Sequence, residues 1–382
     1  MIMPTWPQWM TQRKRVLLIV SLFVALFVGA EIVGRLLERY AGISFSRSAG
    51  YLKANPYLRS ALAPGFRFDT GKYRIEVNSL GFRGPEIAVP KTPGTFRIFA
   101  LGESSTFGWK GARSHDEAWP ALLESKLRAA YPARKIEVVN AGVPGYTSIE
   151  QRINFMLRIS KLQPDALVIY HGNNDLGWSG EPDIETKLVY ARSRDVASPI
   201  TWVDRAIDHT YVGMYIRGRI AFQRRASEHQ SDEVDKATIR MLKDNLQGLV
   251  DDARSRNVKV AIGTFAHGFD EKGVPGIYNG NETGLRVPAA GSYFTYLTPQ
   301  GLRRSFPVYN EMIRQIAKTN SLPLAEPALK IPPTVEYLSD WCHFTAAGEQ
   351  RMAEIWFETI EKAGWLAIRS NSATPSGDAV GR

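Results

Sequence analysis

The chain has 382 residues, 44% of them hydrophobic and 11% aromatic, which excludes disorder by composition and allows a sizeable buried core. Its net charge of +10 suits an anionic surface, but no zinc-finger spacing and no basic run interleaved with aromatic residues indicates nucleic acid as a partner. The single cysteine, Cys342, excludes an internal disulfide and a multi-cysteine metal site. The length fits one large α/β domain with appendages, or two domains.

The N-terminal segment predicts a membrane anchor. The basic triplet Arg13 to Arg15 precedes the uncharged stretch Val16 to Ala30, which as a helix would span about 22 Å. A bilayer core is about 30 Å thick, and the apolar residues after Glu31 let the helix run on and nearly cross it. Because a basic cluster stays in the cytoplasm, the rest of the chain is expected outside.

Residues 1–39 are therefore expected to form a cytoplasmic stub and a single-pass anchor in the inner (cytoplasmic) membrane. The remaining chain would then be periplasmic or otherwise extracytoplasmic. The alternative is a signal peptide, because Val28-Gly29-Ala30 is similar to a small-residue cleavage site. In that case the protein is secreted after cleavage.

Residues 40–93 are expected to form an extended or β-rich connector. Apolar and polar residues alternate from Tyr73 to Asn78, which predicts a strand, and Ser79 to Gly84 supplies turn residues. Pro90 to Gly94 is typical of a linker into the main domain.

From Phe96 onward, apolar strands alternate with helical patterns. Strands are predicted at about 96–101, 135–140, 165–170, 258–265 and 323–326, and helices at about 116–127, 149–162, 232–256, 305–319 and 345–363. This alternation predicts a three-layer α/β/α sandwich with a mainly parallel, flavodoxin-like five-stranded sheet. The domain is expected over residues 94–368, followed by a disordered tail at 369–382.

Two insertions, at residues 176–230 and 268–297, interrupt this rhythm. Both leave the carboxyl ends of strands, where ligands bind in open α/β sheets, and long insertions there are typical of lids or substrate walls. The first contains Tyr211 to Arg225, in which arginines alternate with apolar residues. This segment is either an amphipathic helix resting on an anionic membrane or a solvated helix packed on the domain.

A serine next to glycines follows the first strand. The stretch Gly102 to Gly108 reads Gly-Glu-Ser-Ser-Thr-Phe-Gly and lies between a strand and a helix, where a nucleophile would be mounted or the chain simply turns. Three further polar motifs follow later elements: Asn140-Ala-Gly142, His171-Gly-Asn-Asn-Asp175 and Asp340-Trp-Cys-His343.

Together these motifs carry complementary chemical roles. A serine hydroxyl needs a base to attack an ester, and His343 can take the proton of Ser104 and later return it. Asp340 can accept the other ring N–H and so orient the imidazole. Three donors can stabilise an oxyanion: the N–H of Ser104, the N–H of Gly142 and the side-chain amide of Asn174.

In this order the four motifs resemble the blocks of the SGNH (GDSL-type) hydrolases, over about Phe96 to Ala363. The resemblance implies a nucleophile at Ser104, a base at His343 and its orienting partner at Asp340. It also implies oxyanion donors at Gly142 and Asn174. The segment Val77 to Gly84 looks like the one ahead of the hydrolase domain in membrane-tethered bacterial members.

Two residues near the motifs stand apart. Glu103 occupies the place of the usual aspartate before the nucleophile, a supporting residue outside the triad. Its longer side chain is expected to change how the nucleophile loop is held. His171 is expected either to line the site or to make a structural hydrogen bond.

The predicted function is a serine esterase or acylhydrolase that cleaves a carboxylic ester, an O-acyl carbohydrate or a lipid, through an acyl-enzyme. The alternative is a cell-envelope polysaccharide O-acyltransferase with the same triad, which would need a separate multi-span biosynthesis partner. A non-catalytic binding module is disfavoured by the complete set of motifs. The mechanism requires no cofactor, and no clustered His, Asp or Glu spacing indicates a metal.

Overall fold

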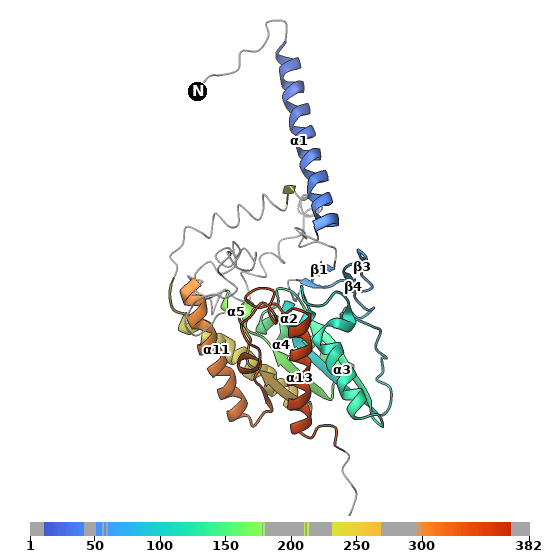
Figure 1. The fold of residues 1–382 in the computed structure, drawn as a ribbon, viewed down its shortest axis with the longest axis vertical. Helices are drawn as coiled ribbons and strands as arrows, with labels where there is room; N and C mark the ends of the chain where they lie inside the picture. Colours follow the sequence, from blue (N-terminus) through green and yellow to red (C-terminus); the bar gives the residue numbers. More distant parts are fainter. Residues whose placement is uncertain are drawn as a thin grey trace, which may run out of the picture.

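The computed structural model describes residues 11–41, 51–55, 57–58, 60–177, 179, 210, 212–213, 231–268, 297 and 299–367. Nearly all of the expected insertions at 176–230 and 268–297, including Tyr211 to Arg225, lie outside these residues, as does the expected tail at 369–382. Their roles as lids, substrate walls or a membrane-contacting helix therefore stay predictions. Figure 1 shows the long helix α1 (Gln12–Ala41) and the α/β body that carries the site.

A five-stranded parallel sheet forms the centre of the body, in the order β6-β5-β7-β8-β9. Its strands are β5 (Thr95–Gly102), β6 (Lys135–Gly142), β7 (Ala166–Tyr170), β8 (Lys259–Gly263) and β9 (Leu324–Ala325). All five residues of β7 are fully buried, as a strand covered on both faces requires. Because the strand order reverses between β5 and β7, a crevice is expected at their carboxyl ends.

Helices cover both faces of the sheet. On one face α3 (Trp119–Ala130) packs against α13 (Ala346–Lys362), with the rings of Trp119 and Trp356 stacked 5.9 Å apart. The other face carries α4 (Ser148–Leu157), α9 (Lys236–Arg254) and α11 (Pro299–Thr319) (Figure 1). The predicted three-layer sandwich is confirmed.

The largest differences from the predicted helix boundaries are at the end of α4 and the start of α11. The helix expected over 149–162 ends at Leu157, and a 3-10 turn follows up to Gln163, whose φ of +54° stops it. The helix expected from Ser305 begins a turn and a half earlier, at Pro299, so that Pro307 lies inside it. A proline inside a helix removes one N–H donor, which makes this boundary hard to predict.

The connector packs onto the α/β body instead of merely leading to it. It forms two antiparallel hairpins, β1 (Leu52–Ala54) with β2 (Ser60–Leu62) and β3 (Arg67–Asp69) with β4 (Arg74–Glu76). Apolar connector side chains form one cluster with residues that follow β5 and β6: Tyr51, Leu58, Leu62, Ile75, Val77, Phe107, Val143 and Tyr146. The core of the body thus extends into the segment that precedes it.

Arg83 of the connector reaches the segment that follows β5. Its side chain is fully buried, its guanidinium donates to the carbonyl oxygens of Phe107 and Ala112, and it lies 4.5 Å from the Phe107 ring. Asn140 Nδ2 donates to the same Phe107 oxygen. Hydrogen bonds from both the connector and β6 therefore stabilise the turn after β5.

Helix α1 has the length and composition of a membrane span. Its stretch Gln12–Leu36 has 25 residues, its most apolar 18-residue window has a mean hydropathy of 2.8, and its apolar side chains are exposed. The helix does continue past Ala30, as expected, and Arg35 forms an ion pair with Glu31 at 3.0 Å. Such a helix suits a signal anchor or a signal peptide.

Glu349 on α13 gives a prediction about stability. Its Oε2 accepts the Trp119 N–H, and its Oε1 has no hydrogen-bond partner in the described part of the chain. Burial raises the pKa of Glu349 to about 8, against the opposing effects of the Trp119 N–H and Arg83. Between the unfolded value near 4.5 and about 8, the folded state binds more protons, so stability falls as the pH rises through this range.

We expect Glu349→Gln to remove the part of this fall that Glu349 causes, because glutamine carries no charge at any of these pH values. Melting temperatures of both proteins at pH 5 and pH 8.5 measure the effect. The control is Glu354→Gln on the same helix, where the carboxylate is part-exposed. Equal pH dependence in wild type and Glu349→Gln would contradict the prediction.

Candidate active site

Ser104 is the first residue of α2 (Ser104–Phe107), directly after β5. Gly102 closes the strand at a point where a Cβ would collide with Thr106 and the Tyr170 carbonyl, so only glycine fits. Gly108 ends α2 with φ +87°. These two glycines fold the chain so sharply that the serine side chain stands at the carboxyl edge of the sheet.

Ser104, His343 and Asp340 meet at this edge. His343 Nε2 lies 2.8 Å from Ser104 Oγ, and His343 Nδ1 lies 2.8 Å from Asp340 Oδ2 and 3.0 Å from Oδ1. The serine and the histidine are half-buried, and the aspartate is buried. These distances are those of hydrogen bonds from hydroxyl to ring and from ring to carboxylate.

The loop that carries the acid–base pair is a tight turn ahead of α13. The Ser339 N–H donates to the His343 carbonyl at 2.8 Å, which closes the turn. Asp340 Oδ1 accepts the N–H groups of Cys342 and His343 at 2.9 and 2.8 Å. This geometry explains why an aspartate and a histidine three residues apart can face each other.

Asp340 is held in its ionised form. Burial alone would raise its pKa, but the opposing effects of His343 and of Lys110 outweigh burial and hold the pKa of this carboxyl well below its usual range. The Lys110 ammonium lies 2.6 Å from Asp340 Oδ2. An ionised aspartate is what the orientation of a neutral histidine and the stabilisation of an imidazolium require.

The acid–base loop also contains a cluster of potential metal-ligating side chains. Among the described residues, the side chains of Asp340, Cys342 and His343 bring their ligand atoms within 4.8 Å of one another. Both imidazole nitrogens already contact a partner, Asp340 on one side and Ser104 on the other. Metal binding at either ring nitrogen would therefore have to break one of these two contacts.

The predicted oxyanion donors differ in their surroundings. The Ser104 N–H has no acceptor among the described residues. Asn174 Nδ2 donates to the Tyr146 carbonyl at 2.8 Å. The Gly142 N–H donates to Asn140 Oδ1 at 3.0 Å, so an oxyanion at that point would have to replace this oxygen.

Gly142 has a packing role in any case. It is the last residue of β6, and a Cβ there would collide with the backbone of Phe107 and Thr106 in α2. The next glycine, Gly145, has φ +85° and precedes Tyr146, the residue whose carbonyl holds the Asn174 amide.

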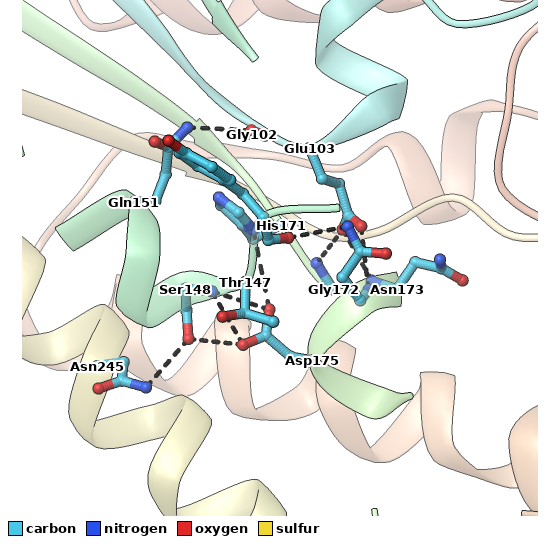
Figure 2. A network of polar contacts seen from close by, with 12 residues as sticks. Gly102, Glu103, Thr147, Ser148, Gln151, His171, Gly172, Asn173, Asp175 and Asn245 are labelled. Atoms are coloured by element: carbon cyan, nitrogen blue, oxygen red, sulfur yellow. Dashed lines mark hydrogen bonds and ion pairs between the residues drawn. The ribbon is translucent and has the colours of Figure 1, made fainter. Parts of the chain in front are cut away.

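Glu103 joins the end of β5 to the loop that carries Asn174, and Figure 2 shows its bonds to Gly172 and Asn173. The fully buried carboxylate accepts three N–H groups at the start of α5 (Asn173–Leu176): those of Gly172 and Asn173 at 2.9 Å and that of Asn174 at 3.0 Å. Burial raises the pKa of Glu103 to about 8, with nearby Asp175 adding to the rise and the three N–H groups opposing it. The longer side chain thus reaches across from β5 to the turn after β7.

His171 belongs to a structural network below the site (Figure 2). Its Nδ1 lies 3.8 Å from Asp175 Oδ2, too far for a hydrogen bond, and burial lowers the pKa of His171 to about 3, so the ring is neutral. Asp175 itself accepts the N–H and the hydroxyl of Ser148 at 2.9 and 2.7 Å. The expected structural hydrogen bond of His171 is not formed within the described residues.

Two residues at the site escaped the sequence analysis. Lys110 contacts Asp340, and Tyr146 supplies the carbonyl that holds the Asn174 amide. A lysine in a loop carries no distinctive signal, and a main-chain acceptor leaves none in the sequence. Only the fold brings them to the site.

A parallel α/β sandwich with this arrangement of serine, histidine, aspartate and amide at its carboxyl edge defines the class of ester hydrolases. Residues 100–351 match the family model of GDSL-like lipases and acylhydrolases, and the chain belongs to this family of ester hydrolases. The resemblance predicted from the four motifs is thereby confirmed.

Similar solved structures include a lipolytic protein of the G-D-S-L family from Desulfitobacterium hafniense, 15% identical, with a TM-score of 0.40 over 69% of this chain and 98% of that one. An acetylxylan esterase from Geobacillus stearothermophilus is 18% identical, with a TM-score of 0.42 over 69% and 94%. The lipase/acylhydrolase from Enterococcus faecalis is 16% identical, with a TM-score of 0.43 over 70% and 96%. No curated protein matches the chain.

Proposed function

We propose that this enzyme cleaves carboxylic esters by nucleophilic catalysis, with Ser104 as nucleophile, His343 as base and Asp340 as its orienting partner. The observation that carries the proposal is the continuous set of contacts from Ser104 Oγ through the imidazole to the Asp340 carboxylate, each 2.8 Å long. A serine hydroxyl near neutral pH is a poor nucleophile unless a base is within hydrogen-bond reach.

In the proposed reaction, Ser104 Oγ bonds to the ester carbonyl carbon while its proton passes to His343 Nε2. The tetrahedral intermediate collapses, the bond to the alcohol oxygen breaks, and His343 returns the proton to that oxygen. Water then attacks the acyl-enzyme by the same route, which releases the carboxylic acid and restores Ser104. Asp340 stays ionised throughout and stabilises the imidazolium.

We infer that the Ser104 N–H and the Asn174 amide bind the oxyanion. The Gly142 N–H stays a predicted donor, but it must first leave Asn140. We add Gly145 as a candidate donor, because it directly precedes Tyr146, the residue whose carbonyl orients the Asn174 amide.

The proposed substrates are esters of the cell envelope, either O-acyl carbohydrates or lipids. Support comes from α1, which is long and apolar enough to anchor the chain in the inner membrane as a single span. The basic residues that precede its apolar stretch favour an extracytoplasmic hydrolase domain. We retain the division into anchor, connector at 40–93, hydrolase domain at 94–368 and tail as a proposal.

Labelling with a fluorophosphonate tests this function. The full chain in detergent is treated with the reagent, and mass spectrometry locates the adduct, which we expect on Ser104. Turnover is then measured on acetyl, octanoyl and palmitoyl esters, with and without an acetylated polysaccharide or a sugar acceptor. An adduct elsewhere would overturn the mechanism, and turnover that depends on the acceptor would replace hydrolysis by O-acyl transfer.

A further inference from the structure

We propose that Lys110 is a positioning residue of this site, which ties Asp340 to the nucleophile segment and places a positive charge beside the acid–base pair. The inference rests on the proposed roles of Ser104, His343 and Asp340. Its starting point is the contact between Lys110 Nζ and Asp340 Oδ2, at 2.6 Å. Nothing in the four sequence motifs includes this lysine.

The backbone at Lys110 is unusual. Its φ is +67°, in the left-handed region that favours glycine and disfavours residues with a Cβ. The next residue, Gly111, is itself a glycine, yet position 110, where φ is positive, is occupied by lysine. The turn thus holds a lysine where the backbone alone would favour glycine, and its side chain crosses to the acid–base loop.

Besides the contact between Ser104 and His343, two hydrogen bonds from side chains of described residues link the nucleophile segment to that loop, and Lys110 makes one of them. The other is the buried Ser105 hydroxyl, which donates to the Cys342 carbonyl at 2.7 Å. The Ser105 link is neutral and fixes the backbone. The Lys110 link is charged and acts on the carboxylate that orients His343.

One carboxylate oxygen of Asp340 contacts both the Lys110 ammonium and the His343 ring. Asp340 Oδ2 contacts both Lys110 Nζ and His343 Nδ1, which places the ammonium within roughly 5 to 6 Å of the ring. A cation at that distance opposes protonation of the imidazole in two ways. It repels the imidazolium directly, and it offsets part of the negative charge by which Asp340 would stabilise that imidazolium.

Other titratable groups surround the pair in the described part of the chain. Cys342 Sγ lies 3.5 Å from His343 Nδ1, and burial raises the pKa of this thiol, which stays neutral. Burial also raises the pKa of Tyr170 on β7. Burial raises the pKa of Glu103 on the nucleophile side to about 8, so this carboxyl is uncharged at acidic pH. Among these groups, Lys110 is the one whose positive charge opposes protonation of the His343 ring.

We expect Lys110→Met to move the acid limb of activity to higher pH by about one unit. Turnover at pH 5 then falls about tenfold, while turnover at pH 8 stays within about twofold of wild type. Lys110→Arg keeps the charge and should keep the limb near its wild-type position. Lys110→Gly relieves the backbone conformation but lacks the charge, so it should follow Lys110→Met.

The experiment measures the rate of fluorophosphonate inactivation of the full chain in detergent from pH 4.5 to 9, for wild type and the three variants. Because the readout is modification of Ser104, it needs no natural substrate. The proposal is supported when Lys110→Met and Lys110→Gly share the shifted limb and Lys110→Arg does not.

Two results would overturn the proposal. One is an unchanged limb in Lys110→Met, and the other is an equal loss at every pH, which indicates a purely structural role. Lys110 is 46% exposed, so these variants should fold, and a melting curve for each checks that they do. Failure of the proposed function is distinct, because wild type would then show no adduct on Ser104.

Discussion

Replacing Ser104 by alanine should lower kcat on an acetyl ester by about 10⁴- to 10⁶-fold and leave the fold intact. The variant lacks the oxygen that lies 2.8 Å from His343 Nε2, so no acyl-enzyme can form. The side chain is half-buried at the start of a short helix, and alanine suits that position. Steady-state turnover and a melting curve measure the two effects separately.

Ser105 offers a matched control, because it is the neighbouring serine in the same turn. Its hydroxyl points to the Cys342 carbonyl and is buried. We expect Ser105→Ala to cost stability but to keep kcat within about tenfold of wild type, since it removes a structural hydrogen bond. Equal losses in both variants, or full activity in Ser104→Ala, would refute the assignment of the nucleophile.

Asn174→Ala should lower kcat by about 10²- to 10³-fold with little change in KM. The side-chain amide is preoriented by its 2.8 Å hydrogen bond to the Tyr146 carbonyl, and the main-chain N–H of Asn174 donates to Glu103. A donor fixed in this way stabilises charge that develops only in the transition state, which affects kcat more than KM.

The neighbouring Asn173 is the control for this prediction. Its side-chain oxygen accepts the Trp341 indole N–H at 3.0 Å, so Asn173→Ala removes a contact of the same helix turn without removing the proposed donor. A rise in KM at constant kcat in Asn174→Ala would show that the amide binds the ground state. Kinetics on one ester for both variants decide the point.

The sheet could be predicted from the sequence because its strands are short apolar runs separated by amphipathic helices. The four motifs follow from the same property, since parallel strands bring their carboxyl ends to one edge. Ser104, His343 and Asp340 were thus predicted as a group, and the structure brings them together. Local spacing sufficed for the pair on the Asp340 loop, whose members lie only three residues apart.

Contacts between distant segments could not be predicted in this way. Lys110 and Asp340 are 230 residues apart, and a half-exposed lysine in a loop has no pattern that indicates a partner. The bond from the Gly142 N–H to Asn140 depends on how the end of β6 curls, which apolar alternation does not encode. The connector was expected to be extended or β-rich and forms two hairpins, but its packing onto the body depends on apolar side chains that come from several loops.

On the proposal that α1 anchors the chain, the docked connector limits the height of the active site above the membrane. Only nine residues, 42–50, separate the end of α1 from Tyr51, so this stretch reaches at most about 36 Å. The Tyr51 ring lies 5.9 Å from that of Phe107, at the end of the helix that Ser104 begins. With the anchor in place, the serine therefore sweeps a thin layer next to the bilayer. Its encounter rate with an ester fixed in that layer depends on the density per unit area, and dilution of the surrounding fluid leaves that rate unchanged.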